Sequence, residues 1–181
     1  MLNGSAAKHG EKPAFLVKHK NSSQYIPVSY EKYKADVEAF GTALMGLELN
    51  GKKVAIIGEN RYEWAVSYLA VVNGTGIVVP LDKELPQNEI EVLIKRSCVD
   101  AVIYSGALAT QFSNSPSSFS NVKFYINMDL EKSYGNKLSY NELIMNGYDA
   151  LKSGDRSFLD ADIDTEVMST LQPDFPINIT T

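Results

Sequence analysis

Residues 53–81 read KVAIIGENRYEWAVSYLAVVNGTGIVVPL, and they set the architecture of the chain. The run Val54–Gly58 is continuously apolar, which is typical of a strand covered on both faces. Asn60 and Glu63 have the spacing of a capping box, with Asn in place of Ser or Thr, so a helix is predicted to begin at Asn60. A second apolar run follows at Ile77–Leu81. The stretch therefore predicts a strand, a crossover helix and a neighbouring parallel strand.

The same alternation continues toward the C-terminus. Two further strands are predicted over Ala101–Tyr104 and Val122–Ile126. One helix is predicted to start at Pro86, and another at the strict capping box Ser139–Glu142, running to about Leu151. Strands that alternate with helices at this spacing favour a three-layer α/β fold, in which a mostly parallel sheet has helices on both faces.

The N-terminal region is predicted to form a β-hairpin from Pro13–Val17 and Tyr25–Ser29. Pro27 cannot donate a ladder hydrogen bond, so its strand should lie at an edge. A helix is predicted to follow from about Ser29 and to end at Asn50–Gly51. Its apolar stripe is formed by residues three or four apart: Tyr33, Val37, Phe40, Leu44 and Leu47.

The composition limits the classes of function. The chain has 181 residues, a formal net charge of −5 and one cysteine. An acidic chain argues against nucleic-acid binding, and one cysteine excludes a disulfide framework. We expect one N-terminal subdomain over residues 1–171 and an irregular tail over 172–181 that contains two prolines. The serine-rich segment 112–120 is interpreted as a loop or a poor helix.

One uncharged stretch, Trp64–Leu81, is long enough to span a bilayer. Asn73, two glycines and Pro80 interrupt it, which favours a helix, a turn and a short strand over a membrane span. The N-terminus shows no apolar region typical of a signal peptide. A cytoplasmic soluble protein is expected.

The first strand-to-helix turn is the place to look for a phosphate site. Nucleotide sites on parallel sheets need a glycine-rich turn whose amides approach the phosphates at a helix N-terminus. The turn Gly58–Arg61 has one glycine and carries Glu59. With one glycine and an acidic residue where a phosphate would lie, this turn is predicted to bind phosphate poorly. The favoured interpretation is that it is the capped start of a helix.

Other candidates for chemistry are weak. Asp160–Asp164 has the opening spacing of a calcium loop, but Thr165 and Leu171 replace the required glycine and glutamate, which favours a solvated acidic loop. His9 and His19 have no partners at ligand spacing.

Three further residues are interpreted as core. Cys98 is predicted on the buried face of a helix, as a small hydrophobic residue. Trp64 and Tyr68 could line a ligand cleft, but their helical spacing favours core packing. The sequence therefore assigns no catalytic, cofactor-binding or metal-binding residue.

Taken in order, several stretches resemble the N-terminal part of AMP-forming acyl-CoA synthetases, the adenylate-forming enzyme family. The resemblance covers about residues 8–171 and is closest to the long-chain fatty acid ligase branch. It is carried by the order and spacing of these stretches: Lys12–Phe15, Val28–Tyr33, Lys53–Trp64, Gly76–Leu81, the helix from Pro86, and Asp164–Ser169.

The resemblance implies a reaction. A fatty acid carboxylate would attack the α-phosphorus of ATP-Mg and release pyrophosphate, and coenzyme A would then displace AMP from the acyl-adenylate. ATP, Mg and coenzyme A are thus implied for full-length members.

The end of the chain departs from the family pattern. After Ser169, the glycine and lysine of the family's phosphate loop are missing, as is the apolar strand before it, and Thr180–Thr181 alone echoes the loop. The resemblance therefore implies a truncated N-terminal piece, inactive alone and prone to self-association through surfaces that the missing part would cover. A non-catalytic α/β module that binds a ligand or a partner is the alternative.

Overall fold

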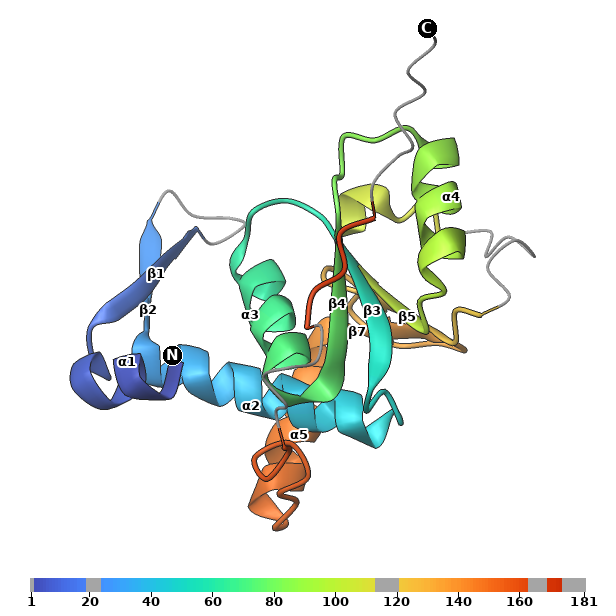
Figure 1. Ribbon diagram of the computed structural model, residues 1–181. Coiled ribbons are helices and arrows are strands. Elements are labelled where there is room, and N and C mark those ends of the chain that lie inside the picture. Colours follow the sequence, from blue (N-terminus) through green and yellow to red (C-terminus); the bar gives the residue numbers. More distant parts are fainter. Residues whose placement is uncertain (1, 19–23, 113–120, 163–168, 174–181) are drawn as a thin grey trace, which may run out of the picture.

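The computed structural model describes residues 2–18, 24–112, 121–162 and 169–173 of the chain (Figure 1). It has a five-stranded parallel sheet with helices on both sides, and a separate two-stranded hairpin. The strands are β1 (Pro13–Lys18), β2 (Tyr25–Ser29), β3 (Lys52–Ile57), β4 (Gly76–Leu81), β5 (Ala101–Tyr104), β6 (Phe124–Asn127) and β7 (Lys137–Ser139). The helices are α1 (Leu2–His9), α2 (Tyr30–Gly46), α3 (Tyr62–Ala70), η1 (Val71–Thr75), α4 (Gln87–Ser97), η2 (Gly106–Leu108) and α5 (Tyr140–Lys152).

The parallel sheet has the order β4-β3-β5-β6-β7, so the first strand of the sheet in the sequence lies inside it. β3 pairs in parallel with β4 on one side, where Val54 lies opposite Val78, and with β5 on the other. The predicted strand, crossover helix and parallel strand over residues 53–81 are therefore confirmed. The three-layer α/β fold with an N-terminal hairpin is confirmed as well.

Alternate residues of the central strands face two separate cores, which explains their continuously apolar sequences. Val54 and Ile56 of β3 pack in a cluster with α2, α3 and α5. Ala55 and Ile57 point to the other face and pack in a cluster with α4. All four side chains are completely buried.

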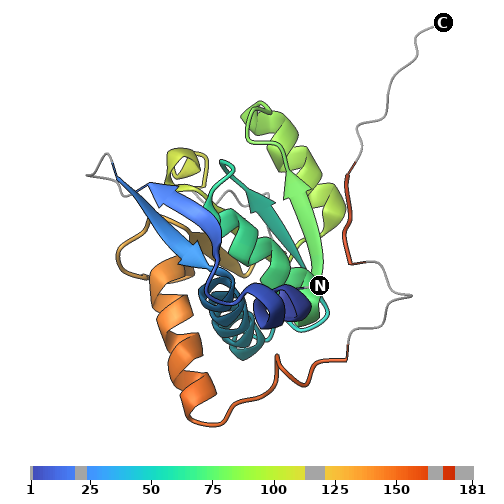
Figure 2. The same cartoon turned by 90° about the vertical axis from the view of Figure 1, so that its left-hand side faces the viewer.

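The hairpin of β1 and β2 stands away from the parallel sheet, on the side of α3 (Figure 1), and Figure 2 shows it face-on. Its strands pair antiparallel, with Leu16 opposite Pro27, so Pro27 lies in an edge strand as predicted. Phe15 joins the hairpin to the rest of the molecule, because its ring packs edge-on against Tyr33 at 4.9 Å and Tyr62 at 5.2 Å between ring centroids.

Two helices begin at serine caps. The Ser29 hydroxyl accepts a hydrogen bond from the Lys32 backbone N–H at 3.2 Å, and α2 starts there. At α5, the Ser139 hydroxyl accepts a longer one from the Glu142 N–H at 3.4 Å. The Glu142 carboxylate, however, accepts from the Ser133 backbone N–H at 2.9 Å. Only half of the predicted capping box therefore forms.

The sequence did not predict α1 or β7, and it indicated no strand before the tail. Ser169–Leu171 lies along the outer edge of β4, where the Val78 N–H donates to the Ser169 carbonyl at 2.9 Å. The Leu171 N–H donates to the Val78 carbonyl at 2.8 Å. Ser169–Leu171 thus forms a single parallel bridge at Thr170 and not a strand, and the expectation that the family's apolar strand is missing stays a prediction.

Two sequence-based expectations concern parts of the chain outside this description. Residues 113–120 of the serine-rich segment and residues 174–181 of the tail lie outside the described residues.

The uncharged stretch Trp64–Leu81 forms most of α3, all of η1 and all of β4. Across the described ranges, no helix combines the length and the apolar character that a membrane crossing requires.

Candidate functional site

The candidate site lies at the carboxyl ends of β3, β5 and β6, where three loops converge. The crossovers that contain α3 and α4 leave the sheet on opposite faces, so the direction of the strand order reverses between β3 and β5. In open parallel sheets, ligands bind in the crevice at the carboxyl ends of the strands where this reversal occurs. The polar side chains at this edge are therefore the first place to look for chemistry.

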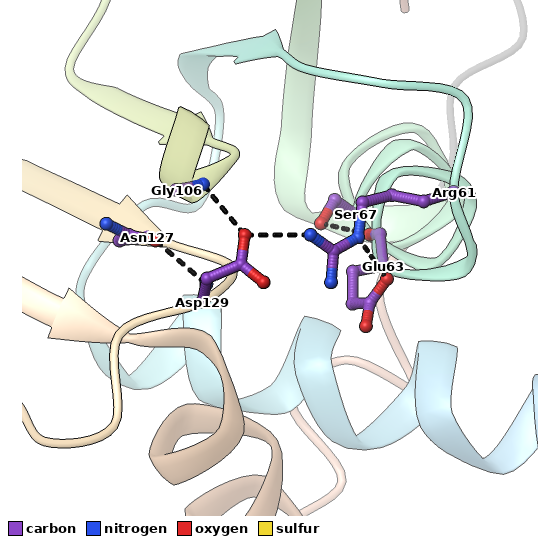
Figure 3. Close-up of polar contacts among 6 residues, drawn as sticks. All are labelled: Arg61, Glu63, Ser67, Gly106, Asn127 and Asp129. Carbon is purple, nitrogen blue, oxygen red and sulfur yellow. Dashed lines mark hydrogen bonds and ion pairs between the residues drawn. The ribbon is translucent and has the colours of Figure 1, made fainter. Parts of the chain in front are cut away.

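Arg61 occupies the N-cap position of α3 in an extended conformation. Its Nε donates to Glu63 Oε2 at 2.6 Å, and a terminal guanidinium nitrogen donates to Asp129 Oδ2 at 2.8 Å (Figure 3). The predicted helix start at Asn60 is therefore wrong by two residues. Glu63 bonds the Arg61 side chain instead of closing a capping box with Asn60.

Asp129 follows β6 and joins three loops. Its Oδ2 accepts from the Gly106 backbone N–H at 2.8 Å as well as from Arg61 (Figure 3). The Asp129 N–H in turn donates to Asn127 Oδ1 at 2.8 Å. A Cβ at Gly106 would lie 2.8 Å from the Asp129 Cβ, so a glycine is needed for this approach. The Asp129 carboxylate therefore holds the loops after β3, β5 and β6 together.

The turn after β3 packs directly on the end of β5. A Cβ at Gly58 would lie 3.1 Å from the Ser105 Cβ, so this glycine permits close contact between the two strand ends. Ser105 is completely buried, and its Oγ has no hydrogen-bond partner in the described part of the chain. The glycine serves packing against Ser105 rather than access for a phosphate.

The electrostatics of this edge do not suit a nucleoside triphosphate. Hydrogen bonds to Glu63 and Asp129 raise the pKa of Arg61, so its guanidinium stays charged, but two carboxylates already surround it. The Gly106 N–H, which points where an anion could bind, already donates to Asp129. The Arg61 guanidinium and the Gly106 N–H at this edge are therefore already engaged by carboxylates.

Two hollows flank the Arg61–Asp129 ion pair. One, of about 580 Å³, is lined by the η2 loop, by Asn127 and by residues 129–132. The other, of about 700 Å³, lies between the hairpin and the start of α3 and is called the hairpin groove below. It is lined by residues 15–18, Tyr25 and residues 60–65. The second hollow is the more apolar, because Phe15, Leu16, Val17 and Trp64 contribute to its walls.

Trp64 and Tyr68 lie on one side of α3, and their rings stack with centroids 5.4 Å apart. Both side chains are half-buried and pack against the core. Trp64 also lines the hairpin groove. The two alternatives from the sequence, core packing and a cleft wall, thus both describe Trp64.

The expectation that Cys98 is buried is wrong. Helix α4 ends at Ser97, and Cys98 takes a left-handed conformation with φ of 51° and ψ of 50°. This change of direction turns the side chain outward and leaves Cys98 exposed, while Ile90, Leu93 and Ile94 remain on the buried face.

Those remaining metal and histidine candidates that the structure describes do not gather at this edge. Asp160 accepts two hydrogen bonds from Arg156, at 3.0 and 3.1 Å, and Asp164 and His19 lie outside the described residues. Within the described ranges, no three His, Cys, Asp or Glu side chains come together in a way that could bind a metal ion.

A buried carboxylate beneath the hairpin was missed by sequence analysis. Asp36 of α2 accepts hydrogen bonds from Tyr62 at 2.7 Å, from Tyr148 at 2.6 Å and from Lys32 at 2.6 Å. Burial and the Asp36 carboxylate raise the pKa of both tyrosines. Asp36 thus joins α2, α3 and α5, and its position on the apolar side of α2 was the one available signal.

Comparison with solved structures agrees with this architecture. The coronafacic acid ligase from Pectobacterium brasiliense superposes with a TM-score of 0.76 at 20% identity over 94% of this chain. The N-terminal domain of FACL13 from Mycobacterium tuberculosis gives 0.67 at 17% over 90%, and the anthranilate CoA ligase AuaEII gives 0.67 at 17% over 80%. The chain spans 32%, 35% and 26% of these structures, respectively. At these identities the likeness shows a shared fold.

The family follows from sequence. No curated protein matches the chain. A sequence model described as AMP-binding enzyme, however, matches residues 2–155. The match begins in α1, ends just after α5 and includes the hairpin, the parallel sheet and the Arg61–Asp129 pair. Because it spans well over half of the sequence, this chain belongs to the AMP-binding enzyme family.

Proposed function

We propose that this chain is the N-terminal part of an ATP-dependent, AMP-forming ligase that joins a fatty acid to coenzyme A. The observation that supports it is the family match over residues 2–155, together with a fold shared with the anthranilate CoA ligase and the coronafacic acid ligase. Residues 1–171 then serve as the N-terminal subdomain, and residues 172–181 form the tail that follows it.

The chain alone does not carry out adenylation in this proposal. The carboxyl edge of its sheet binds its own Asp129 where a phosphate would need a donor. Such chemistry depends on positioned donors that neutralise the charge of the transferred group. At the edge where these donors would be needed, the chain provides a guanidinium that two carboxylates already engage.

A pyrophosphate-release assay tests this proposal. The purified chain is incubated with ATP, Mg²⁺, coenzyme A and palmitate, and a complete ligase of the family with its own acid is run in parallel. We expect pyrophosphate release at the level of the buffer blank from the chain and robust release from the complete ligase. Turnover by the purified chain well above the blank would show that it adenylates by itself.

The acid is proposed to be a long-chain fatty acid because the sequence resembles that branch of the family. The test requires the DNA that follows the Thr181 codon. If it encodes the rest of a ligase, the complete enzyme should turn over palmitate faster than an aromatic acid such as anthranilate, and the reverse preference would contradict the fatty acid proposal. We place this activity in the cytoplasm, which cell fractionation with an antibody would check.

A non-catalytic binding module is the second candidate, and the hairpin groove of about 700 Å³ favours it. The two candidates differ in what the gene encodes. A stop codon after Thr181 with a stable, soluble product would support the module, whereas a continuous reading frame would support the ligase.

A further inference from the structure

Residues 169–171, called the edge segment below, lie along the outer edge of β4 (Figure 1). Their side chains contact both faces of the parallel sheet. A hydrogen bond of 3.2 Å joins the hydroxyls of Thr170 and Tyr68, which belongs to α3. Leu171 packs against the apolar cluster on the side of α4. The edge segment therefore joins the border of the sheet to the helices on both of its faces.

Few contacts hold the edge segment in place. In the described part of the chain it exchanges two backbone hydrogen bonds with β4, both at Val78. A backbone hydrogen bond contributes about 1 kcal/mol net to stability. Ser169 is exposed, and Thr170 and Leu171 are only partly buried. Segments with so few buried contacts open locally at a much lower free energy than the whole domain, so the edge segment has a docked and a released state.

Tyr68 connects the edge segment to the hairpin groove. Its ring stacks on the ring of Trp64, one helical turn earlier, with centroids 5.4 Å apart and an angle of 14° between the ring planes. Trp64 in turn lines the hairpin groove. Tyr68 thus contacts Thr170 through its hydroxyl and Trp64 through its ring. A movement of Tyr68 therefore changes the support behind one wall of the groove.

We propose that the edge segment is a latch for the hairpin groove. When it is docked on β4, it holds the Tyr68 hydroxyl, and the stacked rings keep Trp64 in place as a wall of the groove. When it is released, Tyr68 loses this bond and Trp64 becomes more mobile. The edge segment is the two-state element that such coupling requires. This inference rests on these contacts and is independent of the proposed ligase function.

The fluorescence of Trp64 tests the latch, because Trp64 is the one tryptophan of the chain. Thr170→Val keeps the shape of the side chain and removes its hydroxyl, so the emission should shift to longer wavelength. Quenching by acrylamide should rise by about 1.5-fold or more, since local opening exposes the ring. Ser169→Ala is the matched control, because Ser169 contributes its backbone carbonyl and its side chain is exposed. Equal emission and quenching in wild type and Thr170→Val would overturn the proposal.

Leu171→Pro separates docking from its effect on the groove. Proline removes the N–H that donates to the Val78 carbonyl, so the edge segment should be released. The Val78 N–H should then exchange with deuterium about tenfold faster, and the quenching of Trp64 should rise with it. Faster exchange with unchanged quenching, or unchanged exchange, would contradict the latch. Circular dichroism establishes that the variant remains folded.

The coupling must also act in the opposite direction, because coupling free energies are reciprocal. Trp64→Leu removes the stacked ring and should speed the exchange of the Val78 N–H by about twofold or more. Tyr25→Leu is the matched control, since Tyr25 lines the groove on the side of the hairpin, and it should leave this exchange unchanged. Equal exchange rates in wild type and Trp64→Leu would refute the connection between the groove and the edge segment.

Discussion

The parallel sheet and the hairpin of this molecule contain similar apolar residues, but these residues are buried to different extents. Ile56 of the parallel sheet is completely buried between helices, while Ile26 of the hairpin is 51% exposed. Both lie in short strands rich in apolar residues. What differs is the cover, because α2, α3 and α5 pack on one face of the parallel sheet and α4 on the other, whereas Phe15 anchors just one part of the hairpin. Residue type alone therefore does not determine where the stability of a sheet lies.

The largest contrast is expected from isoleucine truncation in the two sheets. Ile56→Ala removes a fully buried side chain and should lower the free energy of unfolding by about 2–5 kcal/mol. Ile26→Ala, at an exposed position, should change it by less than about 0.5 kcal/mol. Urea unfolding followed by circular dichroism measures both at a concentration where the chain is monomeric. Similar losses in the two variants would show that the hairpin is part of the cooperative core.

The next effect concerns the helices that cover the parallel sheet. Asp36→Asn removes a buried carboxylate that accepts hydrogen bonds from Tyr62, Tyr148 and Lys32, and it should cost about 2 kcal/mol. Glu31→Gln, at an exposed position on the same helix and outside this cluster, is the matched control and should lie near the wild type. If the two variants unfold at the same urea concentration, Asp36 does not join these helices energetically.

A smaller loss is expected where two of these helices approach closely. A Cβ at Gly147 of α5 would lie 1.8 Å from the Ala39 carbonyl oxygen of α2, so Gly147→Ala must push the helices apart. We expect a net cost of about 1–2 kcal/mol after the gain in helix propensity. Gly46→Ala is the control, because nothing lies within 4 Å of its added Cβ. If the urea midpoint of Gly147→Ala equals or exceeds that of Gly46→Ala, α5 can move away from α2 without loss of stability.

The smallest effect is a pH dependence at the contact between hairpin and body. Burial raises the pKa of Tyr33 to about 12, so this hydroxyl keeps its proton in the folded state while the unfolded chain begins to lose it near pH 10. The contribution of Tyr33 to the free energy of unfolding should thus be flat below pH 9 and fall above pH 10, by less than about 1 kcal/mol at pH 10.5. Tyr62 and Tyr148, whose pKa values are also raised, should add to the total alkaline loss. Tyr33→Phe should show a shallower alkaline slope than the wild type. Parallel slopes would exclude Tyr33 as the group responsible.

The parts of the fold that were predictable are those set by local pattern. Val54–Gly58 and Ile77–Leu81 could be assigned because a strand buried on both faces must be apolar throughout. β7 was missed because Lys137–Ser139 has three residues and one apolar side chain. Ser169–Leu171 was missed for the same reason, since two backbone hydrogen bonds to Val78 define it. Short strands depend on a neighbour that the local sequence does not show.

The candidate site was less predictable because its contacts span the chain. The spacing of Asn60 and Glu63 suggested a capping box, but Arg61 bonds Glu63 and an aspartate 68 residues away. The prediction that Cys98 is buried was wrong for a local reason, because α4 ends one residue earlier than the apolar spacing suggests. The poor fit of the Gly58–Arg61 turn to a phosphate stays a prediction, which rests on Glu59 and the single glycine.

The position of β3 inside the sheet also bears on the order in which the sheet can assemble. During synthesis β3 emerges first, and β4, β5, β6 and β7 each join an edge that is already exposed. Val78, however, waits about ninety residues for its partner Thr170. Closing so long a loop is entropically costly, and a single bridge is the contact that offsets this cost. The contact between Val78 of β4 and residues 169–171 should therefore be the last part of the sheet to form on the ribosome. It should also be the first to open in native-state hydrogen exchange.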